Sequence, residues 1–171
     1  TKARPKIADY PFTTIHPNLG VAWVDGYEMV IADIPGLIEG AHEGTGLGDR
    51  FLKHIERCYA LLHLVDATLD DVIGAYKAIR RELELYDVAT AGKPEVVALN
   101  KCDALTEKEL AVKQRQLEKV SGKKVFVMSA VAKRGIWECL REVNRYITRD
   151  RSQKEEAPMQ IEAAGEPWSP V

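Results

Sequence analysis

Three short, nearly unbroken apolar runs constrain the fold of this chain more than any other feature. They cover residues 60–65, 96–99 and 125–128. Apolar runs of this length are typical of parallel strands that are covered by helices on both faces. Segments with helical periodicity accompany them, over residues 49–58, 69–86, 106–120 and 135–147. Strands that alternate with helices connect by right-handed crossovers, so the pattern predicts a doubly wound, three-layer α/β domain.

A hairpin is expected ahead of the parallel strands. Residues 20–24 and 28–32 are short β-prone runs that flank Asp25 and Gly26, a pair suited to a tight turn. This predicts an antiparallel hairpin at the edge of a mostly parallel sheet. A second local signal is the spacing of Thr106 and Glu109, which is that of a capping box at the start of a helix.

Length and composition limit the class of protein. The 171 residues are 46% hydrophobic and 29% charged, as in one globular domain with a sizeable core. We expect that domain over residues 1–149 and a loose tail over 150–171, where the periodicity stops. The formal charge of −2 provides no overall attraction to nucleic acid, and no run of about 18 apolar residues occurs. We therefore expect no membrane span and a cytoplasmic location. We also expect a monomer.

Ligands of doubly wound sheets bind at the carboxyl ends of the parallel strands. The run over 96–99 is followed there by an NKxD arrangement, Asn100, Lys101, Cys102 and Asp103. A carboxylate at Asp103 can accept from both N1–H and the 2-amino group of guanine, and adenine offers no such donor pair. Asn100 can bond N7, and the stem of Lys101 can lie over the base or sugar. An ordinary solvated turn can contain the same residues. The position of the NKxD segment directly after a strand favours a guanine site over such a turn.

The next strand end carries a complementary segment, Ser129, Ala130 and Val131. The backbone N–H of Ala130 could donate to guanine O6, since the small side chains permit close approach. Alone, the segment is equally consistent with a plain turn between a strand and a helix. Two consecutive strand ends with complementary contacts favour a guanine pocket.

A DxxG arrangement, Asp33, Ile34, Pro35 and Gly36, ends the second hairpin strand. Asp33 can hold Mg²⁺ through water, and the N–H of Gly36 can approach a terminal phosphate because no side chain blocks it. The alternative is an ordinary Pro-Gly turn. Five glycines between residues 36 and 48 favour a loop that changes its order with the phosphate state of a nucleotide.

A Pro-bounded loop with two hydroxyls precedes the hairpin and contains Phe12, Thr13, Thr14, Ile15 and His16. A Thr hydroxyl is a hard oxygen ligand for Mg²⁺, and its backbone N–H can touch a γ-phosphate. Spacing alone does not decide which threonine does so.

Together these ordered signals resemble the GTPase domain of the P-loop GTPases, and more narrowly the Obg family. The stretches DYPFTT at 9–14, DIPGLIEGA at 33–41 and GxGLG at 44–48 are similar to the signatures of that family. The resemblance covers about residues 1–148. It implies GTP and GDP as ligands and Thr14 as the direct Mg²⁺ ligand in a switch loop over 12–16. It also implies a role in assembly of the large ribosomal subunit, with its rRNA as a partner.

Two departures qualify the resemblance. The phosphate loop GxxxxGK[ST] does not occur in the sequence. We expect it to precede Thr1 in a longer protein, together with a preceding strand and a following helix. That strand would lie between those ending at Asp33 and Val65, and we expect tight nucleotide binding to need the loop. Leu37 stands where many GTPases place a water-orienting Gln. Hydrolysis is therefore expected to be slow, or to use a monovalent cation, Glu39 or a partner.

Three functions compete on the sequence. The first is a guanine-nucleotide switch that slowly hydrolyses GTP, which the NKxD and Thr-Thr segments favour for the whole protein. The second is a non-catalytic fragment or pseudo-GTPase that acts as a ribosome- or protein-binding module, which the absent phosphate loop favours for this chain. The third is an ATP-using P-loop enzyme, and Asp103 argues against it.

Overall fold

The computed structural model describes residues 18–33, 55–86 and 88–156 of the chain. Strands β1 (Asn18–Val24) and β2 (Tyr27–Asp33) form the expected antiparallel hairpin. Asp25 and Gly26 have φ values of 50° and 87°, and positive φ at both central residues is what a tight type I′ turn requires.

A parallel sheet of three strands forms the centre of the fold. Its order is β3 (Leu61–Asp66), β4 (Glu95–Asn100) and β5 (Val125–Val127). Residues 95–99 of the central strand are all buried, as expected for a parallel strand covered on both faces. The predicted α/β fold class is therefore confirmed. Among the described residues the hairpin pairs only with itself, so it forms a separate two-stranded sheet.

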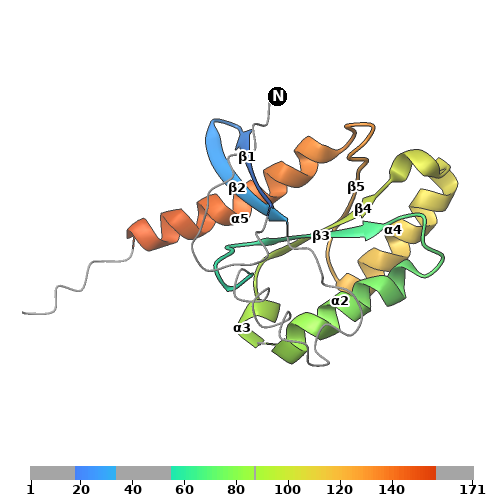
Figure 1. Ribbon diagram of the computed structural model, residues 1–171, viewed down its shortest axis with the longest axis horizontal. Helices are drawn as coiled ribbons and strands as arrows, with labels where there is room; N and C mark the ends of the chain where they lie inside the picture. Colours follow the sequence, from blue (N-terminus) through green and yellow to red (C-terminus); the bar gives the residue numbers. More distant parts are fainter. Residues whose placement is uncertain (1–17, 34–54, 87, 157–171) are drawn as a thin grey trace, which may run out of the picture.

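Alternate residues of β4 pack against different helical layers. Val97 and Leu99 join the core beneath α2 (Val72–Tyr86) and α4 (Glu107–Ser121). Val96 and Ala98 pack on the other face, where α5 (Ile136–Glu156) lies. The hairpin belongs to this second layer, because its buried residues pack in the same core as α5. Figure 1 shows α2 and α4 on one side of the parallel sheet and α5 with the hairpin on the other.

Helix boundaries agree with the sequence pattern in part. At the start of α4, the Thr106 hydroxyl accepts from the N–H of Glu109 and the Glu109 carboxylate accepts from the N–H of Thr106, which confirms the capping box. Helix α2 begins at Val72 instead of residue 69. Helix α5 does not end at residue 147 but continues to Glu156, through residues 150–156 that were expected in a loose tail.

The longer α5 has a compositional cause. After residue 147 the sequence TRDRSQKEE holds neither Gly nor Pro, and most of its residues lose little free energy in a helix. The apolar stripe that predicts packing of the helix against the sheet stops at residue 147, whereas the helix propensity of the sequence continues beyond it. Of the helix expected over 49–58, Ile55 and Glu56 are helical, and residues 49–54 lie outside the described residues. A short helix, α3 (Val88–Ala91), precedes β4.

Candidate functional site

The NKxD segment lies at the carboxyl end of β4, beside the loop that follows β5. Oδ1 of Asn100 accepts a hydrogen bond from the backbone N–H of Ala130 at 3.1 Å. Two backbone bonds reinforce this contact, from Met128 N–H to Leu99 O at 2.8 Å and from Cys102 N–H to Met128 O at 3.1 Å. The two strand-end segments of the predicted guanine pocket are therefore neighbours. The Ala130 N–H that we expected to face guanine O6 is engaged by Asn100 in this structure.

Asp103 is an exposed carboxylate that a hydrogen bond with Ser129 orients. It lies in the single turn of 3-10 helix η1 (Cys102–Ala104), where Cys102 is buried. A hydrogen bond with the Ser129 side chain lowers the pKa of Asp103 below its ordinary value. Ser129 is buried, and its Oγ also accepts from the backbone N–H of Ala132 at 2.9 Å. Asp103 is thus ionised, held from one side and open to solvent, which suits a group that must accept from donors of a ligand.

The loop after β5 closes on itself. Ser129 and Arg134 exchange both backbone hydrogen bonds, at 3.0 and 3.1 Å. Gly135 follows with φ 66°, and a Cβ there would overlap the carbonyl oxygen of Val127. Val131 stands at the tip of the loop with 87% of its surface exposed. The loop therefore presents Ala130 and Val131 on a fixed backbone.

Lys101 extends from this edge toward β3. Its backbone is left-handed, with φ 64°, and its Nζ lies 2.6 Å from Oδ2 of Asp66. Asp66 is the last residue of β3 and is in register with Asn100. Sequence reasoning did not include Asp66 in the site. The available signal was an Asp placed directly after the apolar run over 60–65, at the same edge as the NKxD segment.

Asp33 is the one residue of the predicted Mg²⁺ set that the structure describes. It ends β2 and is exposed. An exposed carboxylate at the end of a strand fits a Mg²⁺ ion held through water, because this ion prefers oxygen ligands and retains part of its water shell. The remaining residues predicted for the phosphate, Mg²⁺ and catalytic groups lie outside the described residues: Phe12, Thr13, Thr14, Ile15, His16, Ile34, Pro35, Gly36 and Glu39.

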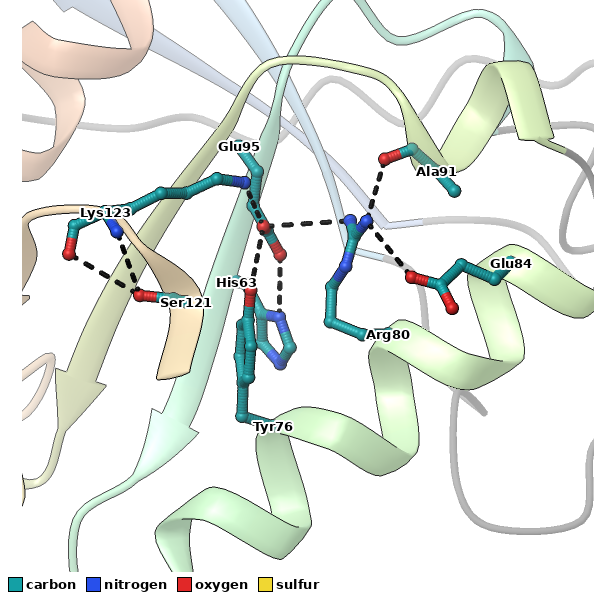
Figure 2. Close-up of polar contacts among 8 residues, drawn as sticks. All are labelled: His63, Tyr76, Arg80, Glu84, Ala91, Glu95, Ser121 and Lys123. Atoms are coloured by element: carbon teal, nitrogen blue, oxygen red, sulfur yellow. Dashed lines mark hydrogen bonds and ion pairs between the residues drawn. The ribbon is translucent and has the colours of Figure 1, made fainter. Parts of the chain in front are cut away.

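A second polar cluster lies at the opposite end of β4 and was not predicted. The side chain of Glu95 is fully buried there, and several polar groups surround its carboxylate (Figure 2). Its carboxylate contacts His63 Nδ1 at 3.0 Å, Tyr76 OH at 3.3 Å, Lys123 Nζ at 2.5 Å and Arg80 Nη1 at 3.7 Å. We call these five residues the Glu95 cluster. It joins α2 and the turn before β5 to the sheet.

The Glu95 cluster is charged. Burial by itself would raise the pKa of Glu95, but hydrogen bonds from His63 and Lys123 dominate and hold that pKa at about 2. Burial and the neighbouring Glu95 charge raise the pKa of Tyr76 to about 12. The ring of His63 stacks on Tyr76 with centroids 5.0 Å apart. At neutral pH the cluster therefore holds an ionised Glu95 and a neutral Tyr76, far along β4 from the NKxD edge.

In the described ranges, none of the helices combines the length and the apolar character that crossing a membrane requires.

The architecture is that of solved G domains. The cytosolic domain of L. pneumophila FeoB matches with a TM-score of 0.59 and 22% identity, over 85% of this chain and 60% of that one. The FeoB G domain of Methanococcus jannaschii matches with a TM-score of 0.58 and 24% identity, over 76% and 79%. A nucleolar GTP-binding protein 1 of Plasmodium falciparum matches with a TM-score of 0.53 and 15% identity, over 80% and 73%. At these identities the likeness concerns the fold.

Family membership rests on a sequence model. The model described as 50S ribosome-binding GTPase matches residues 1–101, which is more than half of the chain. The chain belongs to this GTPase family.

Proposed function

We propose that this chain is the guanine-nucleotide switch domain of an Obg-type GTPase that acts in assembly of the large ribosomal subunit. The observation that carries the proposal is the contact between Asn100 and Ala130. It brings residues 100–103 and 129–131 to one strand-end edge, where doubly wound sheets bind ligands.

Three of the described residues then have a role in recognising guanine: Asp103, Asn100 and Ala130. Asp103 accepts from N1–H and the 2-amino group, because its carboxylate is ionised and open to solvent. The Oδ1 of Asn100 is used by Ala130, which leaves its amide NH₂ to donate to N7. On binding, guanine O6 competes with Asn100 for the N–H of Ala130.

The switch itself involves residues named from the sequence. Thr14 and Asp33 would hold Mg²⁺, which supplies positive charge at the β- and γ-phosphates. Gly36 and the glycines that follow would order against the γ-phosphate and release it after hydrolysis. Because Leu37 cannot orient water, hydrolysis is slow or depends on Glu39, a monovalent cation or a partner. The name of the family supports the ribosome as that partner.

The test is nucleotide-dependent binding to the ribosome. Because GxxxxGK[ST] does not occur in these 171 residues, the full-length product of the gene is used beside the chain. Each is sedimented with isolated large ribosomal subunits in the presence of GDP or a non-hydrolysable GTP analogue, and phosphate release from GTP is followed in parallel. Preferential sedimentation with the analogue, together with slow turnover, supports the switch. Equal sedimentation with both nucleotides and no turnover supports the interaction module.

The source of catalysis is tested in the same protein. Turnover is compared in potassium and sodium buffers, with and without large subunits, and in Glu39→Ala. Fast turnover that is unchanged by the cation, the subunits and the substitution would eliminate all three proposed replacements for the missing Gln.

A further inference from the structure

Asp66 occupies a central place at the nucleotide edge. It is the last residue of β3, and its register partner on β4 is Asn100. The backbone N–H of Ala67 donates to Asn100 O at 2.9 Å, so the pairing continues past the strand end. Asp66 therefore lies next to the NKxD segment but outside it.

Both carboxylate oxygens of Asp66 are engaged. Oδ2 lies 2.6 Å from Nζ of Lys101. Oδ1 accepts from the backbone N–H of Thr68 at 2.9 Å and from its hydroxyl at 2.7 Å. The Thr68 contacts fix the side-chain rotamer of Asp66, so the oxygen that faces Lys101 has a defined position.

The loop that follows Asp66 is anchored by α4. Nζ of Lys113 donates to the carbonyl oxygens of Ala67 and Leu69, at 2.8 and 2.7 Å. Ala67 itself is fully buried in the core. The segment next to the anchor for Lys101 is thus tied to α4 by two hydrogen bonds and to the core by Ala67.

Lys101 needs such an anchor. Its side chain is 56% exposed and has four rotatable bonds, so an unanchored stem would sample many rotamers. The backbone of Lys101 is left-handed and lies at the start of η1, whereas its Nζ contacts Asp66 at the end of β3. The side chain is therefore held at both ends. The methylene groups between these two points span the edge from β4 to β3.

We propose that Asp66 is a positioning residue of the base subsite, which holds the ammonium of Lys101 so that its aliphatic stem forms a preformed surface for the guanine base or its sugar. This inference rests on the proposed function. Asp66 does not touch the nucleotide in this account, and it acts through Lys101. It contributes to affinity for all purine nucleotides alike, whereas Asp103 discriminates among them.

The test is a double-mutant cycle on GDP affinity in the full-length product of the gene. Asp66→Asn keeps an oxygen that can accept from Thr68 and removes the charge that holds Lys101. Lys101→Met keeps an apolar stem and removes the ammonium. We expect Asp66→Asn to weaken GDP binding about fivefold, because an ordered stem becomes mobile. In the Lys101→Met background the same substitution should have no further effect.

Two comparisons separate positioning from a general structural effect. The ratio of GDP to IDP affinity should not change in Asp66→Asn, because IDP lacks the 2-amino group that Asp103 reads. The matched control is Asp70→Asn, which removes the same charge at an exposed position of the loop that follows Asp66 and should bind GDP as the wild type does. Thermal unfolding of each variant reports on folding.

The outcomes are distinguishable. If wild type binds GDP and Asp66→Asn binds it equally well, or loses the same affinity with Lys101→Met present, the positioning role is wrong and the proposed function stands. If wild type binds no guanine nucleotide, the proposed function fails, and the role of Asp66 fails with it.

Discussion

Oδ1 of Asn100 accepts a hydrogen bond from the backbone N–H of Ala130 at 3.1 Å, and this is the contact that a side chain of the NKxD segment makes with the backbone of the second loop of the candidate base site. In Asn100→Ala this bond is lost, and amide exchange at Ala130 should accelerate about tenfold in the absence of nucleotide, which corresponds to a bond of about 1.4 kcal/mol. Hydrogen exchange followed by NMR measures the effect. Asn100→Asp keeps an acceptor and should retain protection. Unchanged exchange in Asn100→Ala would show that the loops are held without this contact.

Asp103→Asn should change base preference rather than abolish binding. The carboxylate only accepts, whereas an amide can also donate to the 2-keto oxygen of xanthine. We expect XDP to bind Asp103→Asn more tightly than GDP does, the reverse of wild type. Competition against a fluorescent nucleotide measures both affinities. A preference for GDP that persists in the variant would contradict the assigned role of Asp103.

Glu95→Gln should destabilise the domain without altering the candidate nucleotide site, which lies at the other end of β4. The substitution leaves Arg80, Lys123 and His63 without the buried carboxylate they contact (Figure 2). We expect a loss of about 2–3 kcal/mol in the free energy of unfolding, below the full cost of breaking a buried pair because Lys123 can reach water. Urea unfolding measures it. The control is Glu84→Gln, whose side chain is 62% exposed and should matter by less than about 0.5 kcal/mol.

The same carboxylate makes stability depend on pH. The pKa of Glu95 is about 2 in the folded chain, against an ordinary value of 4.5. Between these values the unfolded chain binds more protons than the folded one, so acid lowers the free energy of unfolding. The contribution of Glu95 is complete above pH 4.5 and is lost as pH falls toward 2. Urea unfolding at several pH values should therefore show the difference between wild type and Glu95→Gln narrowing below pH 4.5. A constant difference would contradict an ionised Glu95.

Thr106→Ala should cost about 1 kcal/mol in the free energy of unfolding, because it removes the capping hydroxyl of α4. Thr106→Ser keeps the hydroxyl and should restore most of that stability. Urea unfolding of the two variants distinguishes a capping effect from loss of side-chain volume. Equal losses in both variants would attribute the effect to packing of the Thr methyl group.

Local signals predicted local structure well in this chain. Asp25-Gly26 predicted the hairpin turn and Thr106 with Glu109 predicted the capping box, since each needs only neighbouring residues. The apolar runs predicted the parallel strands, because burial on both faces leaves a direct trace in composition. The end of α5 was missed because helix propensity continues after the apolar stripe has stopped.

Contacts between distant segments were harder to predict. The order of the strands predicts that Asn100 and Ala130 lie at one edge of the sheet. It does not predict the hydrogen bond between them, because the sequence suggests the Ala130 N–H as a donor to the ligand. Asp66 and Glu95 were overlooked for the same reason. Each is one carboxylate beside an apolar run, and its role depends on partners 15–35 residues away along the chain. The spacing of residues within one segment gives no signal for contacts between distant segments.

The central claim is that residues 100–103 and 129–131 form a guanine pocket, and calorimetric titration with GDP and ADP tests it most directly. The titrations use the full-length product of the gene, in Mg²⁺, with the 171-residue chain in parallel. We predict that the full-length protein binds GDP at least about a hundredfold more tightly than ADP, as expected for a site that leaves unpaired polar groups against the wrong base. Equal affinity for the two nucleotides, or binding of neither, would contradict the claim.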